Sequence, residues 1–179
     1  MKLHIGCGEK YLPGYKHLDA RKFPHVDYVT DDLSNLSMFE NNTIEEIYAC
    51  HILEHFTREE MESGIILKEW YRILKDGGIL RIAVPNFEAI VDEYLSSKNL
   101  DSLMGLLYGG QDYEYNFHFQ TYDFNRISHL LKNIGFSEIK TYDWKDFLPK
   151  DYDDFSRAYI PHMDFKNGRL MSLNIIAIK

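Results

Sequence analysis

The chain alternates between short runs of apolar and β-branched residues and longer stretches in which apolar side chains recur every three or four positions. The short runs are typical of β-strands, and the longer spacing is typical of amphipathic helices. The predicted strands are Lys2–Ile5, Lys16–Asp19, Val26–Thr30, Glu46–Cys50, Ile79–Val84, Phe136–Trp144 and Ser172–Ile178. The predicted helices are Arg58–Leu74, Phe87–Leu95, Asp101–Tyr108 and Asp123–Ile134. This alternation indicates an α/β fold with a parallel sheet.

Local signals sharpen the ends of these elements. Thr57, with Glu60 three residues later, forms a capping-box pattern at the start of the long helix that follows, and residues 76–78 (DGG) are expected to end that helix. The spacer from Gly8 to Lys16 is shorter than the dozen or so residues that a parallel crossover usually needs. We therefore expect the first crossover to be a loop or a single turn rather than a full helix.

Glycines and acids follow the predicted strands, at the edge where a parallel sheet binds its ligands. Glycines let a backbone pass close to a ligand, and an acid after the second strand can accept hydrogen bonds from both ribose hydroxyls. An acid after the third strand can accept one from an exocyclic amine such as that of adenine. The residues expected along this rim are Gly6, Gly8, Asp19, Asp32, Cys50 and His51. Tyr11 stands where a dinucleotide fingerprint has its third glycine, so we expect a nucleoside ligand without a pyrophosphate.

Several ordered motifs resemble those of class I S-adenosylmethionine-dependent methyltransferases. The segments LHIGCG, HLDA, TDDL, IYACHILEH and KEWYRILKDGGILRIAVPNFE carry the resemblance from Lys2 to about Glu88, and it resumes at Asp123–Phe136. They are most similar to a small bacterial branch whose genes often lie among those for surface sugars. The resemblance implies a Rossmann-like, mostly parallel sheet with an antiparallel last strand. Because the chain starts on the first predicted strand, we expect a minimal form without the N-terminal covering helix that usually precedes it in this family. The resemblance also implies one methyltransferase domain over 1–179, with 96–120 and 145–170 as substrate-covering segments.

The resemblance also implies roles for the rim residues. Gly6 and Gly8 would pass the methionine part of S-adenosylmethionine, with Cys7 as a small space-filling residue between them. Asp19 would hold the ribose hydroxyls. Asp32 and the backbone of Leu33 would meet adenine, with Asp31 as a less favoured substitute for Asp32. Cys50 and His51 would lie beside the sulfonium and the methyl group.

Fewer sequence signals point to the residues that would bind and activate the methyl acceptor. A hydroxyl acceptor usually needs a base with a pKa near the operating pH, and histidine is the natural candidate. His118, in the irregular segment before the last helix, is the first candidate for catalysis, although a loop histidine bonded to the backbone explains it equally well. His51 is the second candidate. The candidates for substrate contacts are His55, Asp112, Tyr113 and Tyr115.

Two further interpretations remain open. HILEH (51–55) matches the inverted zinc-protease pattern H-x-x-E-H, in which two histidines on one helix face bind zinc. Because His51 directly follows a β-like run, a zinc hydrolase using His51, Glu54 and His55 is a remote alternative, and no metal is expected. The other alternative is a non-catalytic S-adenosylmethionine-binding module that acts with a partner.

The composition limits the classes of molecule that the protein is expected to bind. The formal net charge of −8 disfavours nucleic acid as the acceptor, and no apolar run approaches the length of a membrane span. The two cysteines do not form a disulfide framework, and the N-terminus does not look like a secretion signal. We expect a cytoplasmic enzyme that methylates a polar small molecule, with a sugar or nucleotide-linked sugar hydroxyl as one candidate. The sequence is also compatible with a homodimer.

Overall fold

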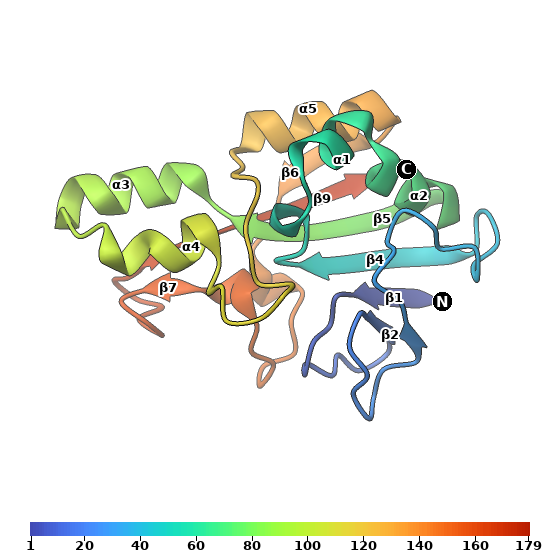
Figure 1. Ribbon diagram of the computed structural model, residues 1–179, viewed down its shortest axis with the longest axis horizontal. Coiled ribbons are helices and arrows are strands. Elements are labelled where there is room, and N and C mark those ends of the chain that lie inside the picture. Colours follow the sequence, from blue (N-terminus) through green and yellow to red (C-terminus); the bar gives the residue numbers. More distant parts are fainter.

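A seven-stranded sheet with the order β3-β2-β1-β4-β5-β9-β6 forms the centre of the computed structural model, which describes residues 1–179 (Figure 1). Its strands are β1 (Lys2–Ile5), β2 (Lys16–Asp19), β3 (Tyr28–Val29), β4 (Ile44–Cys50), β5 (Leu74–Pro85), β6 (Ser137–Thr141) and β9 (Ser172–Ile178). The strands from β3 to β5 pair in parallel, whereas β9 runs antiparallel to both of its neighbours. The predicted Rossmann-like sheet with an antiparallel last strand is confirmed.

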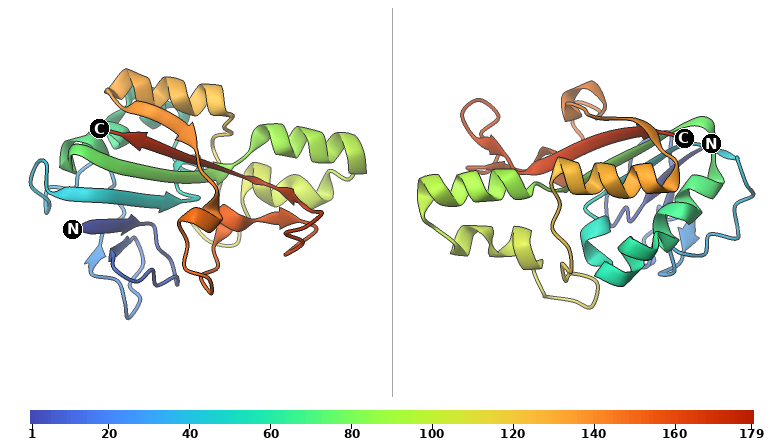
Figure 2. Two further views of the ribbon diagram at one scale, coloured as in Figure 1. Left: turned by 180° about the vertical axis from the view of Figure 1, so that it is seen from behind. Right: turned by 90° about the horizontal axis from the view of Figure 1, so that it is seen from above.

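The helices lie mainly on one face of this sheet (Figure 2, right). They are α1 (Arg58–Ser63), α2 (Ile65–Ile73), α3 (Phe87–Ser97), α4 (Met104–Tyr108) and α5 (Phe124–Ile134). Short 3-10 turns are η1 (Leu53–His55), η2 (Asp101–Leu103), η3 (Trp144–Asp146) and η4 (Phe155–Arg157), and β7 (Tyr159–Ile160) pairs with β8 (Arg169–Leu170). None of the helices combines the length and the apolar composition that a membrane-crossing segment needs.

Different elements cover the two faces of the sheet. On the helical face, buried side chains of α2 and α5 such as Trp70 and Leu131 join the main core. On the other face, Leu148 and Tyr152, from the long connection between β6 and β9, pack with Leu12 and Tyr48. A loop rather than a helix therefore covers that face, and this loop belongs to the segment expected to cover a substrate.

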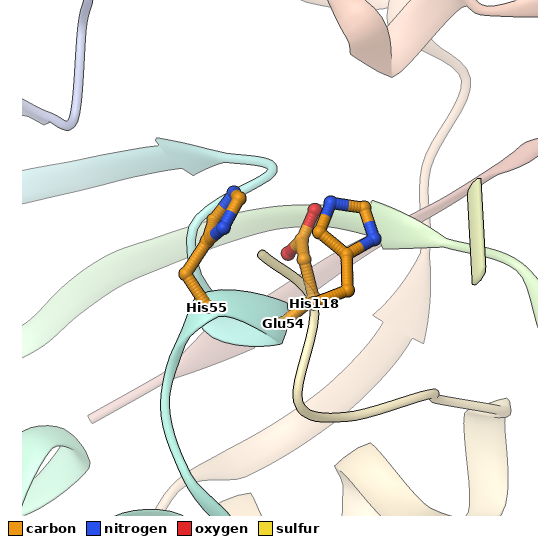
Figure 3. A group of neighbouring side chains, drawn as sticks. All are labelled: Glu54, His55 and His118. Carbon is orange, nitrogen blue, oxygen red and sulfur yellow. The ribbon is translucent and has the colours of Figure 1, made fainter. Parts of the chain in front are cut away.

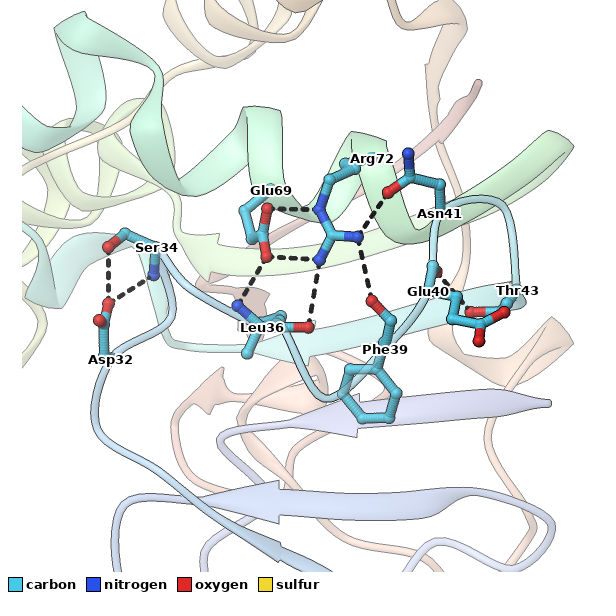
Figure 4. A network of polar contacts seen from close by, with 9 residues as sticks. All are labelled: Asp32, Ser34, Leu36, Phe39, Glu40, Asn41, Thr43, Glu69 and Arg72. Atoms are coloured by element: carbon cyan, nitrogen blue, oxygen red, sulfur yellow. Dashed lines mark hydrogen bonds and ion pairs between the residues drawn. The ribbon is translucent and has the colours of Figure 1, made fainter.

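The first crossover has no helix, as predicted from its short spacer. The loop from β1 to β2 is instead anchored by Leu12, whose side chain is buried and whose amide donates to His17 Nε2 at 2.9 Å. The loop before β4 is likewise irregular. It is held by Arg72, whose guanidinium donates to the carbonyls of Leu36 and Phe39 while the Glu69 carboxylate accepts from the Leu36 amide (Figure 4). Side-chain hydrogen bonds thus replace crossover helices in this half of the molecule.

Several predicted boundaries differ from the structure, including those of the strands expected over Val26–Thr30 and Phe136–Trp144, and two of the differences have a clear cause. The helix expected over Arg58–Leu74 breaks at Gly64, which has φ of 73° and whose missing Cβ leaves room for Ile134 Cδ1. Residues 76–78 do not end a helix but lie inside β5, because this stretch pairs with the end of the chain: the Gly77 amide donates to the Lys179 carbonyl and the Lys179 amide to the Gly78 carbonyl. Both errors come from contacts between residues distant in sequence.

Candidate active site

A cavity of about 970 Å³ opens beyond the carboxyl ends of β1, β2 and β4. The lining comes from the strand ends and from both of the segments that we expected to cover a substrate. Among the predicted site residues, those that line it are Gly6, Cys7, Gly8, Asp19, Leu33, Cys50, His51, His55, Tyr113, Tyr115 and His118. Asp32 and Asp112 do not line it.

The loop after β1 needs glycine at its first position. Gly6 has φ of +64°, and a Cβ there would lie 1.9 Å from Ile52 Cδ1. Gly8 also has a positive φ, of +53°, but a Cβ there would meet only Arg21 at 3.6 Å. The side chain of Ile52, which follows β4, therefore fills the space that Gly6 leaves, and the two strand ends pack directly against each other.

Asp19 ends β2 and fixes the glycine loop. Its side chain is almost fully buried, with Oδ2 accepting from the Gly8 amide at 2.7 Å and Oδ1 from the Arg21 amide at 2.9 Å. Each carboxylate oxygen can accept a further hydrogen bond, so the cavity-lining edge of Asp19 retains acceptor capacity. Burial, followed by the charge of Asp19, raises the pKa of the neighbouring Cys7 thiol to about 12, which keeps that side chain neutral.

The two acids after β3, Asp31 and Asp32, do not take the positions that we expected. Asp31 and Leu33 line the cavity. Asp32 instead closes a local turn, since its Oδ1 accepts from the amide of Ser34 at 3.0 Å and from its hydroxyl at 2.6 Å (Figure 4). Asp31, rather than the expected Asp32, is therefore the acid that lines the cavity after β3. Asp112 is similarly engaged outside the cavity, where it accepts from Asn116 Nδ2 at 2.6 Å.

The HILEH stretch turns away from β4 at once. His51 has φ of 54°, and only Leu53–His55 form a short 3-10 turn. The two histidines therefore do not sit on one helix face as a zinc-protease pair would. His51 Nε2 lies 3.3 Å from Ser172 Oγ, and its Nδ1 lies 3.1 Å from Glu54 Oε1. Cys50 beside it is half-buried at the cavity wall, and the burial raises the pKa of its thiol well above the ordinary value.

Glu54, His55 and His118 come together (Figure 3), and the two histidines line the cavity whereas Glu54 does not. One ligand-capable atom from each of them lies within 4.8 Å of the other two. His55 Nδ1 is 3.0 Å from the Phe117 carbonyl oxygen, and His118 Nδ1 is 3.0 Å from that of Leu106. Glu54 is fully buried. Spacing along the chain did not reveal this group, because His118 comes from a segment far from the other two.

Residues 109–120 contact both sides of the cavity. At one end, the amide of Phe119 donates to the Glu54 carbonyl at 2.7 Å. At the other, the Tyr113 ring lies 4.7 Å from the guanidinium carbon of Arg21, which follows β2. Sequence reasoning missed Arg21, and an arginine two residues after the strand-end acid was the only local signal for it.

Comparison with known proteins gives the family context. Residues 14–82 match the family model described as a methyltransferase domain. No curated protein shows a significant match to the chain. The matched region runs from the loop after β1 to the middle of β5, and so includes the ends of β2, β3 and β4.

Solved structures similar to this one cover nearly the whole chain. An S-adenosylmethionine-dependent methyltransferase from Archaeoglobus fulgidus matches with 15% identity and a TM-score of 0.59, over 99% of this chain and 85% of the other. One from Thermotoga maritima matches with 17% identity and a TM-score of 0.58, over 99% and 81%. A Haloferax volcanii methyltransferase in complex with its Trm112 activator matches with 11% identity and a TM-score of 0.54, over 99% and 81%. The chain therefore shares the fold of these methyltransferases, and its residues 14–82 match a methyltransferase domain.

Proposed function

We propose that the protein transfers the methyl group of S-adenosylmethionine to a hydroxyl of a polar small molecule, for which a sugar or nucleotide-linked sugar is the favoured class. One observation carries this proposal: a single cavity joins the glycine loop and Asp19 to a polar-aromatic wall that includes Tyr113 and His118. This cavity would hold a nucleoside-bearing methyl donor and a hydroxylated acceptor next to each other.

The cofactor would lie along the strand ends. The backbone at Gly6 and Gly8 passes the methionine part, and the free acceptor capacity of Asp19 receives the ribose hydroxyls. Leu33 packs at the adenine end, where we assign the polar contact to Asp31 because the Asp32 carboxylate is occupied by its turn. The sulfonium then faces the end of β4, beside Cys50 and His51.

The acceptor would lie between the end of β4 and residues 109–120. Tyr113 and Tyr115 offer rings and hydroxyls to a sugar, and His55 offers an imidazole. In the transfer, His118 or His51 would accept the proton of the acceptor hydroxyl while its oxygen bonds to the methyl carbon, and the carbon–sulfur bond would break to leave neutral S-adenosylhomocysteine. Alignment of the two reactants supplies much of the rate of such a displacement.

Calorimetry with S-adenosylmethionine and S-adenosylhomocysteine tests the cofactor site. Asp19→Asn should weaken binding of both by about tenfold to 100-fold, since hydrogen bonds to a charged group contribute about 1.5–3 kcal/mol. Asp32→Asn is the matched control, because its carboxylate does not line the cavity, and it should bind within about twofold of the wild type. Absence of binding to the unaltered protein would refute the assignment.

A methyl-transfer screen identifies the acceptor. The panel contains nucleotide sugars, sugar phosphates and small amines, and the readout is release of S-adenosylhomocysteine. Turnover confined to the sugars supports the proposal, and turnover confined to amines contradicts it. Binding of the cofactor without any turnover favours the alternative of a module that acts with a partner, and the Haloferax volcanii complex with an activator is a precedent for such an arrangement in this fold.

A further inference from the structure

Glu54 is a buried acid without an adequate partner. Its side chain is fully enclosed, and neither carboxylate oxygen accepts a hydrogen bond of good geometry. The nearest ionisable atom is His51 Nδ1, 3.1 Å from Oε1. An enclosed carboxylate with an unoccupied oxygen is costly unless a cation or a set of donors compensates it. A stable buried carboxylate at Glu54 therefore requires a nearby positive charge, of which His51 supplies only part.

Two histidines beside Glu54 are oriented to offer that compensation through a bound cation. The Nδ1 atoms of His55 and His118 each lie 3.0 Å from a backbone carbonyl oxygen, to which only a protonated nitrogen can donate. In the neutral ring, the Nε2 atom of each histidine then keeps its lone pair. Metal-binding histidines are fixed in this way, with one ring nitrogen donating to a carbonyl and the other facing the ion.

The three side chains are close enough to share one ion. Their ligand-capable atoms lie within 4.8 Å of one another, and Figure 3 shows the carboxylate between the two rings. Metal–ligand bonds of about 2.0–2.1 Å would bring the ligands to about 3.3 Å apart, so small side-chain rotations suffice. Two imidazoles and one carboxylate suit zinc, iron or a similar first-row ion, whereas magnesium and calcium prefer oxygen ligands throughout.

We propose that Glu54, His55 and His118 bind one divalent first-row transition-metal ion, with zinc as its representative, and that its open position takes the acceptor hydroxyl. Three protein ligands with an open fourth position are typical of catalytic rather than structural zinc sites. His55 and His118 line the cavity, so the open position faces the space assigned to the acceptor. The part concerning the acceptor rests on the proposed function, whereas metal binding does not.

The ion would change how the acceptor is activated. A hydroxyl bound to a divalent cation loses its proton more readily, and that proton passes to water before the oxygen attacks the methyl carbon. His118 then serves as a ligand and not as the base. The ion would also join η1 to residues 109–120, and so fix the covering segment over the site.

Cobalt(II) titration of chelator-treated protein tests the site without any methyl donor. The visible absorption of cobalt reports coordination by protein ligands, and zinc should displace it at one equivalent. His55→Ala and His118→Ala should each weaken binding by more than about 100-fold, since even an outer-shell change commonly costs 10–100-fold. Glu54→Gln should do the same if it folds; if it does not, the two histidine variants decide the test.

His129→Ala is the matched control, because His129 is exposed on α5 and does not line the cavity. It should bind cobalt as the wild type does. Failure of the unaltered protein to bind cobalt or zinc, or equal binding by the histidine variants, would overturn the metal site. Calorimetry with S-adenosylhomocysteine on the same preparations separates the two proposals. If the protein binds S-adenosylhomocysteine but neither cobalt nor zinc, only the metal site is refuted. If it binds the metal but not S-adenosylhomocysteine, only the methyltransferase assignment is refuted.

Discussion

The contact between Gly6 and Ile52 predicts a strong and specific effect of adding one methyl group. Gly6→Ala places a residue with a side chain at φ of +64°, which costs about 1–2 kcal/mol for a left-handed backbone. The added Cβ also lies 1.9 Å from Ile52 Cδ1 and 2.6 Å from Cγ1, so the isoleucine must move, at about 1–3 kcal/mol for overpacking. The free energy of unfolding should fall by about 2–5 kcal/mol in urea denaturation.

Two comparisons isolate the steric part. Gly14→Ala has φ of +85° with nothing within 4 Å of the new Cβ, so it should lose only the backbone part, about 1–2 kcal/mol. Ile52→Ala removes the clashing atoms, and a double-mutant cycle with Gly6→Ala should show a coupling of about 1–3 kcal/mol. Equal losses in the two glycine variants, together with a coupling near zero, would refute the packing argument.

Two other regions give predictions of their own. Arg72→Met leaves the carbonyls of Leu36 and Phe39 without a donor and should lower the free energy of unfolding by about 2–3 kcal/mol in urea. Arg58→Met, at an exposed ion pair, is the control and should change it by less than about 0.5 kcal/mol. Similar losses in the two variants would contradict the stabilising role of the Arg72 hydrogen bonds. Burial, and then the nearby His17, lowers the pKa of His4 from its usual 6.5 to about 3. The unfolded chain therefore takes up this proton first, so stability present above about pH 6.5 is lost as the pH falls, at up to about 1.4 kcal/mol per pH unit. His4→Gln should flatten that slope in denaturation curves between pH 7 and 4, and an unchanged slope would contradict it.

The sheet and its ligand-binding edge could be predicted because their signals are local. Buried strands are recognisable in the sequence as apolar runs. Parallel pairing then brings their carboxyl ends to one edge of the sheet, independently of the conformation of the loops. Gly6, Gly8 and Asp19 line the cavity for this reason. The short spacer after Gly8 likewise predicted a crossover without a helix, since chain length alone limits what can form there.

The errors arise where the decisive contact is distant in sequence or depends on one turn. Asp31 and Asp32 are adjacent acids, and the hydrogen bonds from Ser34 decide which one faces the cavity. Gly64 breaks a helix whose apolar spacing runs through it. His118 joins Glu54 and His55 only because residues 109–120 fold back over η1, and no periodicity along the chain reports such a return.

The absence of helices between β1 and β4 has a consequence for local stability. The edge strand β3 has only two residues, and Val29 within it is 53% exposed, so little apolar burial protects the amides of this edge. Such regions exchange their amide hydrogens through local opening at a free energy below that of global unfolding. A nucleoside that contacts both Asp19 and Leu33 would bind only the closed form of this edge. Occupancy of the site and protection of these amides are therefore thermodynamically linked, and a ligand present at 100 times its dissociation constant would raise the opening free energy by about 2.7 kcal/mol.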